Sequence, residues 1–168
     1  RIEMRNCTIE HGDRFGVFAT GRTTLDIAGT SIRKHANRGI EMQDSAALRL
    51  TSSEIDGNGD YGLILFEQCQ VKATDCKLTR NTGHGASLRG KASGDFERCA
   101  FTGNRYSGLG CLDAHDGGAV RATQCTFQGN GMRPIYRGPL HLDPLAPTPL
   151  SIDEVAVTCQ ADPGANVE

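Results

Sequence analysis

The sequence predicts an all-β solenoid, in which the chain winds into about six coils with three short strands in each. Two observations carry this prediction: a repeat of 23 residues, and apolar alternation with a period of two inside each repeat. A period of two is typical of half-buried strands and not of helices. One repeat cannot bury its apolar face alone, so successive repeats must stack on one another.

The repeat is defined by a small residue followed two places later by a large apolar residue. The pairs are Cys7/Ile9, Thr30/Ile32, Ser53/Ile55, Cys76/Leu78, Cys99/Phe101 and Cys125/Phe127. Neighbouring pairs are 23 residues apart, except for the last step of 26 residues. Parallel strands of neighbouring coils then pair roughly 4.8 Å apart, so that like residues lie above one another.

Two further columns follow from this register. Five places after the small residue come Asn58, Asn81, Asn104 and Asn130, with His35 in the second coil. We interpret this column as structural, because asparagine amides satisfy backbone groups at turns and tolerate left-handed geometry. Nine places after it come Gly16, Gly39, Gly62, Gly85 and Gly108, which indicate a positive φ or a close backbone approach.

The seven cysteines are an odd number, and four of them share one repeat position. Alternation turns Cys7, Cys76, Cys99 and Cys125 inward, and Cys111 as well. We interpret them as buried reduced thiols that pack as small hydrophobes. A disulfide and a bound metal are the alternatives. Reduced thiols favour an intracellular compartment.

The repeat pattern covers residues 1–138, and a proline-rich segment follows over residues 139–168. Its prolines break helices and central strands. We expect one further strand there, from Ser151 to Cys159, in a cap or a linker. Because Arg1 already lies inside the first strand, and solenoid ends need capping, we expect the chain to be part of a larger protein.

The pattern Asn-x-x-x-Gly-(Ile/Leu)-x-(Leu/Met), followed by Leu-x-Ile and Cys/Ser-x-Ile, resembles the right-handed parallel β-helix of the pectate-lyase-like superfamily. The resemblance covers residues 1–138. It implies a ligand groove along the outer face of the strands that follow the glycine column, with a polyuronate chain as the typical guest. The superfamily hosts lyases, hydrolases, epimerases, phage adhesins and binding modules without activity, so the fold leaves the function open.

Alternation along these strands predicts which side chains point outward. Several of them are apolar and form a candidate docking face for a protein or a glycan. Its members are Phe18, Ile64, Phe66, Leu112 and Tyr136. The same alternation predicts that Leu63→Asp is severely destabilising, because it buries an unpaired charge, whereas Ile64→Asp is mild.

The turns before these strands carry cations and aromatic rings that stacking would align in one stripe. The candidate ligand-binding residues are Arg14, Arg38, Tyr61, His84, Arg89, Arg105, Tyr106 and Arg133. Such a stripe suits an anionic polymer, since rings stack on sugars and guanidinium groups bind carboxylates. The alternative is an ordinary solvated turn surface. The formal net charge of −2 argues against nucleic acid.

Two short motifs favour an enzyme. Gly83-His84-Gly85 resembles the Gly-His-Gly of polygalacturonases, although only Asp60 is near His84 and the other aspartate motifs of that family are missing. Asp113-Ala114-His115-Asp116 resembles the Asp-Pro-His-Asp/Glu of alginate epimerases, and it places Asp113, His115 and Asp116 among the candidate ligand-binding residues. Elimination or epimerisation needs a base and a carboxylate neutraliser, roles that His84, Arg89 and Arg105 would fill.

The sequence predicts no metal, since Asp113 and Asp116 offer too few oxygens for calcium, and no other cofactor. It has no apolar run of the length of about 18 residues that a membrane helix needs. The first hypothesis is therefore a non-catalytic module, a binding or structural scaffold for an anionic polysaccharide or a protein partner. The alternative is a polyuronate lyase, epimerase or hydrolase that uses the basic stripe.

Overall fold

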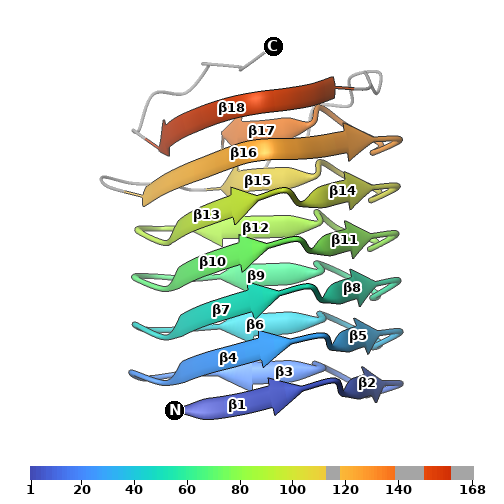
Figure 1. Cartoon of the computed structure of the whole chain (residues 1–168), viewed down its shortest axis with the longest axis vertical. Coiled ribbons are helices and arrows are strands. Elements are labelled where there is room, and N and C mark those ends of the chain that lie inside the picture. Colours follow the sequence, from blue (N-terminus) through green and yellow to red (C-terminus); the bar gives the residue numbers. More distant parts are fainter. Residues whose placement is uncertain (113–117, 139–149, 160–168) are drawn as a thin grey trace.

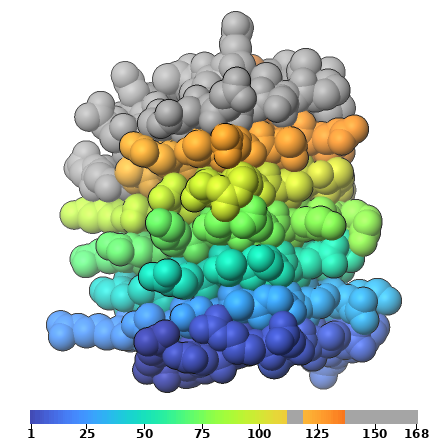
Figure 2. Space-filling view, viewed as in Figure 1, coloured from blue at the N-terminus to red at the C-terminus, as the bar shows by residue number. Residues whose placement is uncertain are grey.

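The computed structural model describes residues 1–112, 118–138 and 150–159, and it confirms the predicted solenoid. The chain is a right-handed parallel β-helix of about six turns, with a spacing of about 23 residues between equivalent positions. Figure 1 shows the strands of successive coils directly above one another, from β1 near the N-terminus to β18 at the opposite end. In Figure 2 successive parts of the chain fill successive layers.

Each of the first five coils contributes three strands, as the sequence predicts. The first strands of the coils are β1 (Ile2–Arg5), β4 (Thr24–Ala28), β7 (Ala47–Thr51), β10 (Gln70–Thr74) and β13 (Ser93–Glu97). The second strands are β2 (Thr8–Glu10), β5 (Ser31–Arg33), β8 (Glu54–Asp56), β11 (Lys77–Thr79) and β14 (Ala100–Thr102). In the sixth coil one longer strand, β16 (Gly118–Gln128), pairs with both series. The third strands are β3 (Val17–Ala19), β6 (Ile40–Met42), β9 (Leu63–Leu65), β12 (Ala86–Arg89), β15 (Leu109–Leu112) and β17 (Ile135–Gly138).

The first and second strands, together with β18 (Leu150–Cys159), form a 12-stranded sheet, and the third strands form a six-stranded sheet. All pairings between coils are parallel and keep the sequence register, as in Ile40↔Leu63 and Leu63↔Ala86. The exception in direction is β18 (Leu150–Cys159), which pairs antiparallel with β16. This strand lies where the sequence predicts one further strand after the prolines.

The core lies between the sheets and is filled by the inward side chains of every coil. Leu63 and Leu65 of β9 belong to it, as do Phe101 and Phe127, whose rings stack with their centroids 4.9 Å apart. The apolar alternation therefore identifies the core correctly, because a period of two places every second side chain of a strand on the same side.

Single residues in the left-handed region make the corners between strands. One such column comprises Asn6, Gly29, Ser52, Asp75, Arg98 and Gln124, and a second comprises His11, Lys34, Gly57, Arg80, Gly103 and Gly129. A third corner uses Gly21, Asp44, Glu67 and Gly90. The asparagine and glycine columns noted in the sequence are absent from this set of positive φ angles. Of the two explanations offered for the glycine column, positive φ is therefore wrong, and the structural interpretation of the asparagine column does not depend on left-handed geometry.

The asparagine column instead forms a buried hydrogen-bonded ladder. The backbone N–H groups of Asn58, Asn81 and Asn104 each donate to Oδ1 of the next asparagine, at 3.1, 3.1 and 3.0 Å. The Nδ2 groups of the same three residues donate to the same oxygens. Asn104 Nδ2 also reaches the carbonyl of Leu78 at 2.9 Å. The ladder satisfies buried backbone groups that would otherwise have no partner.

His35 continues this ladder into the second coil. Its backbone N–H donates to Asn58 Oδ1 at 3.1 Å, and its Nδ1 accepts the N–H of Gly12 at 2.9 Å. Since Nδ1 is an acceptor, Nε2 carries the hydrogen and donates to the carbonyl of Ile9 at 3.1 Å. An imidazole thus performs the acceptor and donor roles that an amide performs in later coils.

The glycine column is explained by close approach. A Cβ atom at Gly62 would lie 2.5 Å from the carbonyl oxygen of Gly85 and 2.7 Å from Asn81 Nδ2. Neighbouring coils thus meet backbone to backbone beside the ladder.

Cys76, Cys99 and Cys125 are buried free thiols, as the sequence predicts, and the N–H of Cys99 lies 3.4 Å from Cys125 Sγ. Cys7 is exposed, contrary to the expectation from alternation, because it lies in the first coil, which packs against a neighbour on one side.

Candidate functional site

The outward row of the six-stranded sheet is less open than its sequence suggests. Phe18 is 51% exposed, but Ile64 is 0%, Tyr136 is 7% and the polar members Glu41 and Ser87 are 3% and 0% exposed. Phe66 is half-buried. The prediction that Ile64 and Tyr136 form an exposed docking face is therefore wrong. The side chain of Leu112 lies outside the described residues.

A layer of arginine and aromatic side chains closes over this row. Arg38 and Tyr61 lie in the turns before the strands, and Phe66 and Arg89 lie at the strand ends. Arg38 contacts Phe66, and Arg89 contacts Tyr61. The guanidinium carbon of Arg38 lies 5.8 Å from the Phe66 ring centroid. Arg89 lies 5.5 Å from Tyr61 and 5.4 Å from Phe66. We call Phe15, Arg38, Tyr61, Phe66 and Arg89 the arginine–aromatic surface.

Stacking at one repeat position builds this surface. Phe15, Arg38, Tyr61 and His84 are 23 residues apart in sequence and therefore lie above one another. Arg38 lies 5.8 Å from the Phe15 centroid and 5.9 Å from the Tyr61 centroid. The rings of Tyr61 and His84 stack at 5.6 Å with planes 10° apart. Planar groups in register give a continuous column across four coils.

The two arginines of the surface differ in their charge partners. Arg38 forms ion pairs with Glu41 and, at 3.3 Å, with Asp60. Arg89 forms no ion pair with a described residue, and its one hydrogen bond there is from Nη2 to the Tyr61 hydroxyl at 3.1 Å. Burial raises the pKa of that hydroxyl, so it stays neutral and does not compensate the guanidinium charge. Arg89 therefore offers a positive charge that is held in place by two rings.

His84 lies beneath this layer and is completely buried. Its Nδ1 accepts the backbone N–H of Ser107 at 3.1 Å, so Nε2 carries the hydrogen. Desolvation by burial lowers the pKa of His84 from 6.5 to about 4. The rings of Tyr61, Tyr106 and Tyr136 surround it, with centroids at 5.6, 5.5 and 6.2 Å.

This environment makes His84 a neutral hydrogen-bond donor and not a base. Its Nε2 has no hydrogen-bond partner among the described residues, and the same holds for the buried hydroxyls of Ser87 and Ser107 and for Arg89 Nε. A general base needs a free lone pair within reach of its substrate. The lone pair of His84 is used by Ser107, and the ring has no exposed atoms.

The structure brings most of the predicted ligand-binding residues into one neighbourhood, but not all. Arg14 joins through Phe15, with 5.0 Å between guanidinium carbon and ring centroid. Tyr106 joins through His84. Arg105 and Arg133 form no ion pair or side-chain hydrogen bond with a described residue, and they stay separate surface cations. Asp113, His115 and Asp116 lie outside the described residues.

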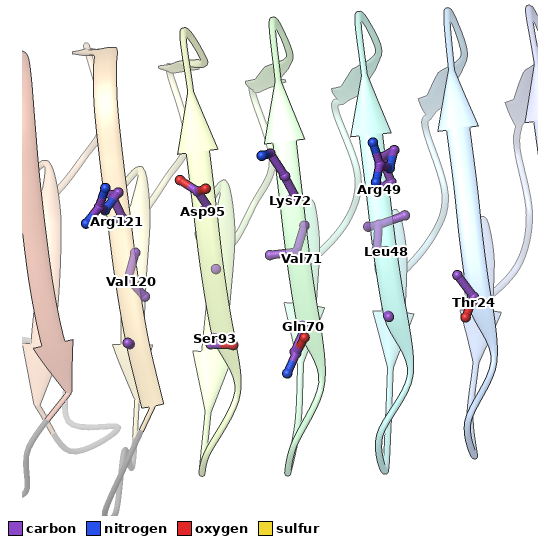
Figure 3. A pocket seen from close by; sticks show the side chains of 13 residues that line it. Thr24, Leu48, Arg49, Gln70, Val71, Lys72, Ser93, Asp95, Val120 and Arg121 are labelled. Carbon is purple, nitrogen blue, oxygen red and sulfur yellow. The ribbon is translucent and has the colours of Figure 1, made fainter.

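Two features escaped the sequence reasoning. The first is Glu41, a buried carboxylate that accepts hydrogen bonds from Arg38 and, at 2.6 Å, from Gln43. Its outward position in an apolar row was visible in the sequence, but its burial depends on Arg38. The second is a groove of about 650 Å³ on the outer face of the 12-stranded sheet. Figure 3 shows Arg49, Lys72, Asp95 and Arg121 in one row across adjacent strands of this groove.

Two features are absent from the parts of the chain that the structure describes. No three His, Cys, Asp or Glu side chains there are grouped to hold a metal ion. Nor do these residues include a helix with the length and apolar character needed to cross a membrane.

Comparisons with known proteins agree with this fold. Residues 1–139 match the family described as "Right handed beta helix region". Among solved structures, a double mutant of the periplasmic alginate epimerase AlgG is similar, with a TM-score of 0.61 and 13% sequence identity. The match covers 84% of this chain and 39% of that protein's chain. A search of curated proteins found no match. The family match extends over most of the sequence, and the chain therefore belongs to the right-handed β-helix family.

Proposed function

We propose that this chain is a binding module for an acidic polysaccharide, and that its arginine–aromatic surface is the binding site. The observation that carries the proposal is Arg89. Its guanidinium is fixed over Tyr61 and Phe66, 5.5 and 5.4 Å from the ring centroids, and no described carboxylate neutralises it. An arginine held in this way is ready to form a bidentate pair with a carboxylate of a ligand.

The rings beside Arg89 suit a sugar chain. Phe15 and Phe66 are half-buried, and Phe18 is 51% exposed and stacks on Phe15 at 5.8 Å between centroids. Rigid rings next to fixed cations give a ligand apolar contact and charge pairing at a small cost in side-chain entropy. The similarity in fold to an alginate epimerase makes alginate and pectate the first polymers to test.

The site geometry favours binding over catalysis. Glycoside hydrolysis requires two carboxyl groups on opposite sides of the bond. The carboxylates of Glu41 and Asp60 both engage one guanidinium, that of Arg38. Elimination or epimerisation requires a base, and the buried imidazole of His84 has no free lone pair.

Affinity electrophoresis in gels that contain alginate or pectate tests the proposal. The chain should be retarded in these gels and not in gels with neutral dextran. Arg89→Gln should weaken binding by about tenfold, roughly the contribution of one charge-assisted hydrogen bond. Arg89→Lys keeps the positive charge but loses the planar guanidinium that binds a carboxylate through two N–H groups. Its affinity for the polymer should therefore lie between those of the wild type and Arg89→Gln.

Arg22→Gln is the matched control, since Arg22 is exposed, forms no ion pair with a described residue and gives the same change in net charge. Equal loss in Arg22→Gln and Arg89→Gln would show non-specific charge attraction and refute the site. Absorbance from an unsaturated product during incubation with either polymer would refute binding without catalysis.

A further inference from the structure

We propose that His84, Ser87 and Arg89 bind a small monovalent anion of the halide class beneath the arginine–aromatic surface. Each of these side chains has a buried polar atom with no hydrogen-bond partner among the described residues: Nε2 of His84, Oγ of Ser87 and Nε of Arg89. Buried polar atoms are nearly always hydrogen-bonded in native proteins, because an unpaired one costs the free energy of its lost hydration. Three such atoms, in β12 and the turn before it, indicate a bound partner.

The fold places the three side chains on the same face of the six-stranded sheet. Ser87 and Arg89 are two residues apart in β12, so their side chains point the same way. The His84 ring lies over Gly110, since a Cβ atom there would be 3.0 Å from its Cδ2 and 3.1 Å from its Cε1. Gly110 is the register partner of Ser87, and paired strands are about 4.8 Å apart. The imidazole, the hydroxyl and the guanidinium therefore border one small region.

The hydrogen-bonding roles of these groups select an anion. Nδ1 of His84 accepts the N–H of Ser107, so its Nε2 is a donor, and Nε of Arg89 can only donate. The Ser87 hydroxyl can donate as well. Three donors fit a ligand that only accepts hydrogen bonds, and a buried anion requires a compensating positive charge. Arg89 supplies a single such charge, which no described carboxylate neutralises, so the ligand should be monovalent.

Burial excludes a polysaccharide from this position. The three polar atoms are enclosed, whereas the Arg89 side chain as a whole is only partly buried. The outer edge of its guanidinium can therefore face a polymer while Nε contacts the internal anion. The acidic groups of the same surface, Glu41 and Asp60, are paired with Arg38 and so repel the anion less. A bound anion offsets part of the Arg89 charge and should weaken polymer binding, a consequence that rests on the proposed function.

Thermal denaturation of the full 168-residue chain tests the inference without any polysaccharide. Sodium chloride and sodium bromide are compared with sodium methanesulfonate at equal ionic strength, because methanesulfonate is also monovalent but too large for an enclosed site. An anion that binds the folded chain alone raises the midpoint of unfolding. In about 0.1 M halide the midpoint should therefore lie about 5 °C above that in methanesulfonate.

The effect of Ser87→Ala should change sign with the salt. In methanesulfonate the variant lacks an unpaired buried hydroxyl and should be at least as stable as the wild type. In halide it loses one hydrogen bond to the anion, so halide affinity should fall about tenfold and the midpoint should lie below that of the wild type. Ser53→Ala is the matched control. Ser53 is also buried, but it lies between β7 and β8 and its hydroxyl donates to the carbonyl of Thr51 at 2.8 Å, so its effect should be equal in both salts.

Arg89→Gln should abolish the halide effect, whereas Arg22→Gln, the same charge change at an exposed residue, should preserve it. Two results would overturn the inference. Equal midpoints of the wild type in halide and methanesulfonate would mean that internal water satisfies the three atoms. An undiminished halide effect in both Ser87→Ala and Arg89→Gln would place the halide elsewhere. Because no polymer is present, failure here is distinct from failure of the proposed function, which retardation in polymer gels decides.

Discussion

At the scale of single residues, the outward row of the six-stranded sheet lies under other side chains. Leu63 belongs to the core cluster and Ile64 does not, yet both are fully buried. Arg38, Tyr61, Phe66 and Arg89 contact one another on the outward side of the sheet. Arg38 and Tyr61 each lie three residues before the outward residue of their strand, whereas Phe66 and Arg89 each lie two residues after it. Contacts between such positions in neighbouring coils depend on side-chain conformations.

Ile64→Asp should therefore destabilise the fold by about 3 kcal/mol, since it buries a charge at a fully covered site. Phe18→Asp is the matched control in the same outward row. Phe18 is 51% exposed, so its substitution should change the free energy of unfolding by less than about 1 kcal/mol. Urea denaturation measures both. Equal small effects would mean that the covering layer opens readily.

The asparagine ladder makes a second prediction about single residues. Asn81→Asp removes the donor to Asn104 Oδ1 and buries a carboxylate beside that oxygen, so it should cost about 3 kcal/mol or more. His35→Asn restores the residue that later coils use and should cost less than about 1 kcal/mol. Thermal denaturation of both variants compares them. A larger loss for His35→Asn would refute the equivalence of imidazole and amide here.

His84 predicts a pH dependence of stability. Its pKa is about 4 in the folded chain and 6.5 as the reference value, so between these values the unfolded chain binds more protons. Stability should fall as pH drops from 6.5 to 4, by an amount of about 3 kcal/mol, and His84 should contribute no further change below that range.

The measurement is the free energy of unfolding across this pH range. His84→Gln should flatten the slope, whereas His11→Gln, at an exposed histidine, should leave it unchanged. An identical slope in wild type and His84→Gln would show that other groups cause it.

Three carboxyl groups affect stability at still lower pH. Hydrogen bonds from Arg5, Thr20 and Arg98 lower the pKa values of Asp26, Asp44 and Asp75, respectively.

At the scale of strands and corners, two glycines of one coil test two different constraints. Gly57 occupies a corner with φ +61° and open space around its Cβ position, whereas Gly62 meets backbone of the next coil at 2.5 Å. Gly57→Ala should cost about 1 kcal/mol through backbone strain alone. Gly62→Ala forces the coils apart and should cost about 3 kcal/mol.

Chemical denaturation of the two variants measures this difference. Gly57→Asn is the control for the corner, since asparagine tolerates the left-handed region better than alanine and should recover part of the loss. The reverse order, with Gly57→Ala the more damaging, would contradict close approach as the reason for the glycine column.

At the scale of the whole molecule, the sequence predicts the architecture well, because the 23-residue repeat determines which strands pair and in which register. Pairs such as Cys76/Leu78 and Cys99/Phe101 fix the register, and the strands pair as that register requires. The site is harder to predict. Arg49 and Lys72 alternate with Leu48 and Val71 like ordinary outward residues, and only the paired strands show that they share a groove. The partners of a side chain across coils depend on packing, which the period does not specify.

The period also makes the coil a removable unit. Deletion of residues 47–69 joins Ala46 to Gln70, whose N–H then meets Thr23, the present partner of Ala47. The shortened chain should keep its β-type circular dichroism and unfold cooperatively at a midpoint several degrees lower, since fewer coils stack. Deletion of residues 47–68 shifts later strands by one residue and should prevent folding. Equal behaviour of both deletions would contradict the strict register.

The direction of the hydrogen bonds between coils has a mechanical consequence. They join neighbouring coils and so lie along the stacking axis, as in the bond from the Leu63 N–H to the carbonyl of Gly85 and the bond from the Asn58 N–H to Asn81 Oδ1. A tensile load applied along that axis opens one row at a time from an end. Each released coil lengthens the tether by about 75 Å, since an extended residue spans about 3.3 Å. Under such a load the molecule should therefore lengthen in equal steps, one for each coil that opens.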